Sequence, residues 1–117
     1  MNPDPSNAAV PDPREINRLL SVLRDSEQGS DRYASTLSAL AILLANDKTG
    51  LMEVVRQCSR APTWDGSVPS KHARDKALKY GFLVKCCYNE EQGYQVTTYL
   101  GWAVIREIDR QKGLKAS

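Results

Sequence analysis

A basic helical pattern stands directly before a β-hairpin pattern between residues 70 and 101, and this order most constrains the fold. Residues 70–80 read SKHARDKALKY, a short helix that Ser70 caps and that Gly81 ends in a left-handed conformation. Two strands are expected next, over residues 82–88 and 94–97. The five residues 89–93 join them, with a glycine late in the connection, as longer hairpins allow.

Helices are expected on both sides of this segment. Asp12 can cap a first helix over residues 14–28, with Pro13 at its first position and Glu15 reaching back toward the cap. Its apolar residues recur at i, i+3, i+4 and i+7, which predicts one buried stripe, and Gly29 ends it. The other expected helices run from Ser30 or Asp31 to about Ala45, from a Thr49 cap through Cys58, and from Thr97 or Thr98 to about Lys112.

The domain organisation follows from length and from the placement of proline. A chain of 117 residues with 41% apolar and 26% charged residues is long enough to bury one core. Four of the six prolines fall in the first thirteen residues, so residues 1–11 are expected to be a disordered tail. Residues 12–117 are expected to form one domain, with a loop over 61–69.

The charge is unevenly distributed along the chain. The formal net charge is only +2, but residues 70–117 hold nine Lys/Arg against five Asp/Glu, whereas residues 1–69 hold seven against nine. A surface for a polyanion would therefore lie in the C-terminal part. The longest apolar stretch, residues 37–45, is too short to cross a bilayer, so no membrane contact is expected. Three cysteines form an odd set, which favours a reduced, cytoplasmic compartment.

The basic helix has two different faces. At 100° per residue, its Lys, Asp and His residues fall on one side, whereas Ala73, Ala77 and Tyr80 fall on the other. A recognition helix needs this division, because its buried face fixes its angle and its polar residues meet base edges and phosphates. The alternative is a solvated amphipathic helix, in which Asp75 forms i, i+4 pairs with Lys71 and Lys79.

The segment resembles the winged helix-turn-helix of MarR-like, PadR-like and ArsR-like bacterial regulators. The resemblance covers roughly residues 33–112 and is most specific at 79–84, where a glycine ends a helix directly before an apolar strand. Residues 94–101 form its second part, a strand followed by Thr98 as cap and by Gly101 three residues later. The expected fold is therefore mainly α with a β-hairpin, a winged helix-turn-helix plus an extra N-terminal helix.

The resemblance implies a non-enzymatic transcriptional regulator that binds double-stranded DNA as a homodimer, with no cofactor. The residues at the positions of its DNA contacts are Ser70, Lys71, His72, Arg74, Asp75 and Lys79. Lys76 lies on the same polar side of the helix, and Lys85 is the only basic residue of the hairpin. These eight residues are the candidate DNA-binding site.

Two features depart from the resemblance or compete with it. The hairpin tip carries Glu90 and Glu91, which would meet phosphates unfavourably, so the domain could instead be an adaptor that contacts a partner protein. An exposed Trp64 in the loop would serve the same role, although the sequence slightly favours a Trp folded back over the core. A metal or redox sensor is a third hypothesis, but the spacing of its candidate ligands matches no zinc pattern; these are Cys58, His72, Cys86 and Cys87.

Overall fold

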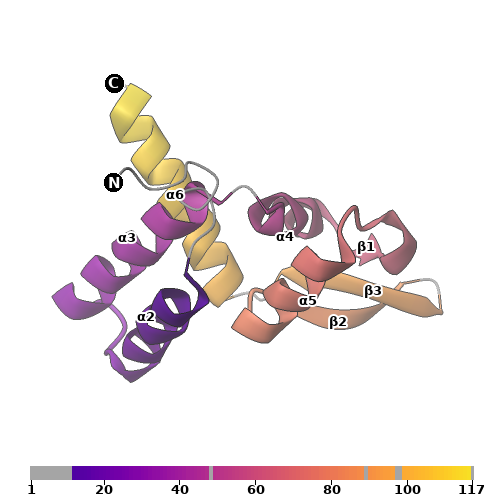
Figure 1. Ribbon diagram of the computed structural model, residues 1–117, viewed down its shortest axis with the longest axis horizontal. Coiled ribbons are helices and arrows are strands. Elements are labelled where there is room, and N and C mark those ends of the chain that lie inside the picture. Colours follow the sequence, from indigo (N-terminus) through magenta and orange to yellow (C-terminus); the bar gives the residue numbers. More distant parts are fainter. Residues whose placement is uncertain (1–11, 48, 89, 97–98, 117) are drawn as a thin grey trace, which may run out of the picture. The chain divides into compact units, whose positions relative to one another are not determined.

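The computed structural model describes residues 12–47, 49–88, 90–96 and 99–116, and it is mainly helical with one small antiparallel sheet (Figure 1). The expected class, mainly α with a β-hairpin, is confirmed at this level. The chain forms two compact units: unit 1 holds residues 1–48 and 104–117, and unit 2 holds residues 49–103. The expected tail over residues 1–11 and the expected caps Thr97 and Thr98 lie outside the described residues.

Unit 1 is helical. It contains α2 (Pro13–Asp25), α3 (Asp31–Ala45) and the part of α6 (Leu100–Ala116) that follows Ala103, and α2 packs against α3. The Gln111 side-chain amide donates to the backbone oxygen and to the Oγ of Ser38, both at 3.1 Å, which ties α6 to α3. The buried apolar residues of this unit are Ile16, Leu19, Leu20, Leu23, Tyr33, Leu40, Ala41, Leu44, Val104, Ile105 and Ile108.

The first helix begins as expected but ends earlier. The Asp12 side chain accepts a hydrogen bond from a first-turn N–H at 2.9 Å, as predicted. Glu15 pairs with Arg18 one turn later rather than with the cap, at 3.1 Å between Oε2 and Nε. The helix stops at Ser26, whose extended backbone breaks the helical ladder, so the expected end at Gly29 was wrong. Gly29 instead turns the chain with a φ of 89°.

The second helix confirms its expected bounds. Ser30 accepts a hydrogen bond from the N–H of Tyr33 at 3.1 Å, and α3 ends at Ala45. Its buried side is narrower than the apolar stretch of residues 37–45 implies, because Ile42 has a relative exposure of 52%. Apolar composition alone therefore overstated how much of this helix is buried.

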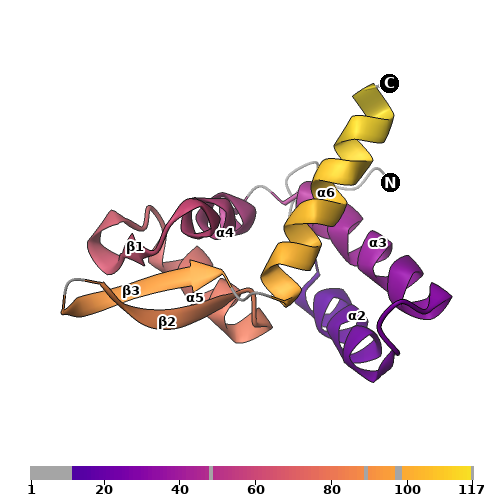
Figure 2. The same ribbon diagram turned by 180° about the vertical axis from the view of Figure 1, so that it is seen from behind.

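Unit 2 contains two helices on one side of a three-stranded sheet (Figures 1 and 2). Its elements are α4 (Leu51–Arg60), β1 (Thr63–Trp64), the 3-10 turn η1 (Asp65–Ser67), α5 (Lys71–Tyr80), β2 (Leu83–Tyr88) and β3 (Glu91–Val96). The strand order is β1-β3-β2, antiparallel throughout. The helices bury their apolar faces here as predicted, and the buried apolar residues are Leu51, Val54, Val55, Cys58, Val68, Ala73, Ala77, Tyr80, Phe82, Leu83, Tyr94 and Val96.

The hairpin is longer, and its connection shorter, than the sequence indicated. Residues 91–93 were expected in the connection, but they belong to β3, and the ladder runs from Leu83 opposite Val96 to Tyr88 opposite Glu91. Gly93 lies between Trp64 and Cys86 in this ladder and is buried. A glycine at this position lets neighbouring side chains approach the backbone, so it marks the middle of a strand here rather than a turn.

Two other local predictions were wrong. The expected loop over residues 61–69 contains β1 and η1, and β1 forms because Thr63 and Trp64 pair with Tyr94 and Gly93. A strand of two residues has no periodicity to detect, so only this pairing reveals it. The residue at the N-cap of α4 is Gly50, in a left-handed conformation with φ 91°, and not Thr49.

Candidate nucleic-acid interface

The helix α5 is fixed at both ends by the residues that the sequence predicted. Ser70 Oγ accepts a hydrogen bond from the N–H of Ala73 at 3.1 Å, and Gly81 ends the helix with a φ of 85°. Ala73, Ala77 and Tyr80 are buried where α5 packs against α4 and β2. Two alanines on this face allow close helix packing, so the opposite face points away from the core of unit 2.

The outward face of α5 is polar and mainly basic. Lys71, His72, Asp75 and Lys79 are exposed, and Lys76 is half-buried, as the helical spacing predicted. Within the described part of the chain, the side chains of His72, Lys76 and Lys79 make no hydrogen bond or ion pair. These three groups are therefore available to a ligand.

Asp65 contacts three other polar groups, and the four residues are here called the Asp65 cluster: Asp65, Lys71, Arg74 and Tyr94. Its Oδ1 accepts hydrogen bonds from the Arg74 guanidinium at 2.6 Å and from the Tyr94 hydroxyl at 2.8 Å. Lys71 Nζ lies 3.3 Å from Oδ2 and donates to the Asp65 backbone oxygen at 2.5 Å. The cluster thus joins η1, α5 and β3.

Arg74 and Tyr94 are the inner members of the Asp65 cluster. The Arg74 side chain is only 18% exposed, and its guanidinium carbon lies 5.7 Å from the centre of the Tyr94 ring, within cation–π range. The guanidinium also lies 2.8 Å from a carboxylate oxygen of Asp75. The i, i+4 pairs expected between Asp75 and the lysines are therefore replaced by a pair with its sequence neighbour.

Contacts within the Asp65 cluster shift the pKa values of its members. Hydrogen bonds from Tyr94 and then from Arg74 hold the pKa of Asp65 below its ordinary value, against a smaller opposing effect of burial. Burial, and next the hydrogen bond to Asp65, raise the pKa of Tyr94. Burial acts to lower the pKa of Arg74, but hydrogen bonds to Asp75 and Asp65 outweigh it, so its pKa is raised. Arg74 is therefore positively charged and links α5 to η1 through Asp65.

The eight predicted contact residues fall into three groups. Among the described residues, His72, Lys76 and Lys79 have no partner on α5, and Asp75 is exposed but pairs with Arg74. Ser70, Lys71 and Arg74 are used within the protein, although the Lys71 side chain remains 51% exposed. Lys85 is exposed on β2, opposite Tyr94 in the ladder.

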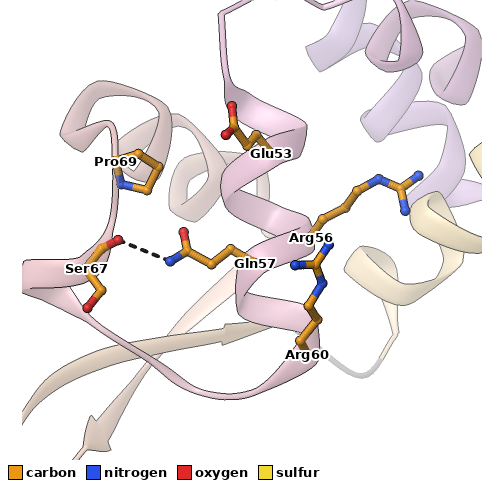
Figure 3. A pocket seen from close by; sticks show the side chains of 6 residues that line it. All are labelled: Glu53, Arg56, Gln57, Arg60, Ser67 and Pro69. Atoms are coloured by element: carbon orange, nitrogen blue, oxygen red, sulfur yellow. Dashed lines mark hydrogen bonds between the residues drawn. The ribbon is translucent and has the colours of Figure 1, made fainter.

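The sequence did not predict the roles of Asp65 and Tyr94. Asp65 precedes Lys71 by six residues and Arg74 by nine, and Tyr94 follows it by 29, so no helical or strand period connects them. An open hollow in unit 2 was also not predicted. It has a volume of about 480 Å³, and it is lined by Glu53, Arg56, Gln57, Arg60, Ser67 and Pro69 (Figure 3).

The cysteines do not form a candidate metal centre. Cys58 is buried, Cys86 is half-buried and Cys87 is exposed, and all three are free thiols. Burial raises the pKa of the Cys58 thiol, with a smaller opposing effect of a hydrogen bond with Thr63. Over the described ranges, no three His, Cys, Asp or Glu residues are grouped so that they could hold a metal ion.

Among the described residues, no helix combines the length and the apolar character that crossing a membrane requires. The chain matches no protein-family model, no curated protein and no solved structure.

Proposed function

We propose that the protein is a non-enzymatic double-stranded DNA-binding protein and a transcriptional regulator, with α5 as its recognition helix. The observation that carries the proposal is the division of α5 into a buried face, formed by Ala73, Ala77 and Tyr80, and an outward face on which Lys76 and Lys79 have no partner among the described residues. A helix placed in this way can enter a major groove while its inner face stays fixed to the core.

The order of elements in unit 2 supports a winged helix-turn-helix. The helix α4, the short strand β1, the helix α5 and the hairpin β2–β3 follow one another in the chain, and β1 lies beside β3 in the sheet. Under this proposal η1 takes the place of a longer helix before α5. The resemblance further implies a homodimer on a two-fold symmetric site.

The charge distribution agrees with a DNA surface in unit 2. This unit holds seven Lys/Arg against five Asp/Glu, whereas unit 1 holds nine of each, so the formal net charge of +2 belongs to unit 2. Two of its five carboxylates, Asp65 and Asp75, are paired with Lys71 or Arg74. Cations with no internal partner therefore provide the positive field.

The proposed contacts are narrower than the set expected from the sequence. His72, Lys76 and Lys79 meet DNA directly, and Lys71 joins them by exchanging Asp65 for a phosphate. Arg74 positions α5 through the Asp65 cluster rather than touching bases. The exposed carboxylates of Glu90 and Glu91 repel phosphates, so the hairpin contributes through Lys85 and not through its tip.

A salt series tests this proposal. Binding of a labelled 30-base-pair duplex should weaken steeply with salt, and Lys79→Ala should reduce the slope by about one unit, because one phosphate contact is lost. Lys112→Ala removes the same charge from an exposed position in unit 1 and should leave the slope unchanged. A wild-type protein that binds no duplex at low salt would refute DNA binding.

A second candidate function is an adaptor that binds a partner protein. Trp64 keeps 43% of its surface exposed on the short strand β1, and Glu90 and Glu91 are exposed at the end of the hairpin. An aromatic anchor beside carboxylates suits a basic protein partner. Reversal of both charges, Glu90→Lys with Glu91→Lys, should then abolish capture of that partner, and the wild-type protein should bind no duplex.

A further inference from the structure

The open hollow of unit 2 lies between α4 and the turn formed by residues 67–69 (Figure 3). We propose that it is a second phosphate-binding site for the DNA backbone, in which Arg60 binds a phosphodiester. The inference rests on the proposed function and adds to it residues outside α5 and the hairpin. It concerns the backbone alone, so it predicts affinity and salt dependence and not base preference.

The walls of the hollow are held in place by one side chain. The Gln57 Nε2 on α4 donates to the backbone oxygen of Ser67 at 3.1 Å, which fixes the turn against the helix. In Figure 3, Gln57 reaches from α4 to this turn, whereas the Arg60 side chain runs back along α4 toward the start of the Arg56 side chain. The Arg56 side chain extends away from this turn, so Arg60 supplies the guanidinium of the proposed site (Figure 3).

The two arginines lie one helical turn apart, so they share a face of α4. Arg60 is exposed, and within the described ranges its side chain makes no ion pair. A guanidinium presents paired N–H donors that match two oxygens of a phosphate. The volume of about 480 Å³ far exceeds the roughly 30 Å³ that one water occupies, so a phosphate fits with its hydration.

Glu53 lines the same hollow and opposes an anion. It lies on α4 one turn before Arg56 and two turns before Arg60, so the hollow has an acidic end and a basic end. A phosphate is therefore expected at the Arg60 end. The same reasoning predicts that removing the Glu53 charge strengthens binding.

The position of the hollow beside the start of α5 makes a joint contact feasible. Pro69 lines the hollow and directly precedes Ser70, the cap of α5, whereas Lys79 lies at the opposite end of that helix. A helix of ten residues is about 15 Å long, and a major groove is about 12 Å wide. The hollow and Lys79 thus lie toward opposite ends of α5, at a separation comparable with the width of one groove.

The test compares arginine variants in the same 30-base-pair duplex assay. Arg60→Ala should lower the slope of log affinity against log salt by about one unit, and Arg60→Lys should restore most of it because the charge returns. Arg106→Ala, an exposed arginine of unit 1, is the matched control and should keep the wild-type slope. Glu53→Gln should raise affinity at low salt. Thermal unfolding of each variant shows that the fold is kept.

The outcomes separate this inference from the proposed function. If Arg60→Ala keeps the wild-type slope while Lys79→Ala lowers it, the hollow is not a phosphate site and DNA binding through α5 stands. If Arg60→Ala and Arg106→Ala lower the slope equally, the effect is one of overall charge, and the inference is overturned. If the wild-type protein binds no duplex at low salt, both the proposed function and the inference fail.

Discussion

Asp65 is the residue that decides which cations of α5 remain available to a partner. It accepts hydrogen bonds from Arg74 and Tyr94 and lies within ion-pair distance of Lys71. Because Arg74 is largely buried against Tyr94, it holds the turn η1 against α5 and β3. Lys76 and Lys79 have no such carboxylate partner in the described part of the chain, and they carry the proposed DNA contacts.

A carboxylate whose pKa is lowered on folding makes stability depend on pH in a defined direction. In the folded protein the pKa of Asp65 lies below its ordinary value of 3.8. The ionised carboxylate therefore adds to the free energy of unfolding above pH 3.8, and this contribution is lost as the pH falls through the folded-state pKa. Asp65→Asn should lower the urea midpoint at pH 6, and the difference from wild type should shrink toward pH 3. Tyr94→Phe removes the hydrogen bond that lowers the pKa of Asp65 most, so the stability of this variant should depend less on pH than that of the wild type. A difference between wild type and Asp65→Asn that stays constant with pH would contradict the role of the cluster.

At the scale of elements, the end of α5 depends on one glycine. Gly81 has a φ of 85°, a conformation that costs an L-residue about 1–2 kcal/mol, and a Cβ placed there would be 3.6 Å from Leu100, which is ordinary contact. Gly81→Ala should therefore reduce the free energy of unfolding by about 1–2 kcal/mol through backbone strain alone. Denaturant titration measures this change.

Gly113→Ala is the matched control for that substitution. Gly113 lies within α6, and a Cβ there meets nothing within 4 Å. Alanine favours a helix over glycine by up to about 1 kcal/mol, so this variant should be unchanged or more stable. Equal losses in the two variants would show that the strain at Gly81 is not the cause.

The elements that the sequence predicted well are those with local signals. Two helices begin at Ser30 and Ser70 and one ends at Gly81, as expected. These positions are predictable because a side-chain cap or a left-handed glycine acts within a few residues. The strand β1 and the short hairpin connection could not be predicted, since Trp64 and Glu91 are placed by pairing with other strands. Such pairing leaves no pattern along the chain.

The candidate site likewise has one part that the sequence predicted and one part that it could not predict. Helical spacing predicted the outward face of α5, including the exposure of His72 and Lys79. It could not predict that Arg74 would be paired within the protein, because its partners Asp65 and Tyr94 lie in separate elements that only the fold brings together. Sequence periodicity therefore located the surface, and tertiary contacts decided which of its cations are available.

At the scale of the whole molecule, the positive charge and the unpaired cations coincide in unit 2. Unit 1 holds equal numbers of Lys/Arg and Asp/Glu and carries a helical core of its own. We therefore propose that nucleic-acid contact belongs to unit 2. This proposal is tested by measuring the reactivity of lysines in both units of the intact chain in one experiment.

Lysine acetylation with and without duplex is that measurement. The intact protein is treated briefly with an acetylating reagent at low salt, alone and saturated with a 30-base-pair duplex, and modification is quantified by mass spectrometry. We predict strong protection of Lys76 and Lys79, partial protection of Lys71 and unchanged reactivity of Lys112 in unit 1. Unchanged reactivity of Lys79 in a saturated complex would contradict the central claim that α5 is the DNA-binding surface.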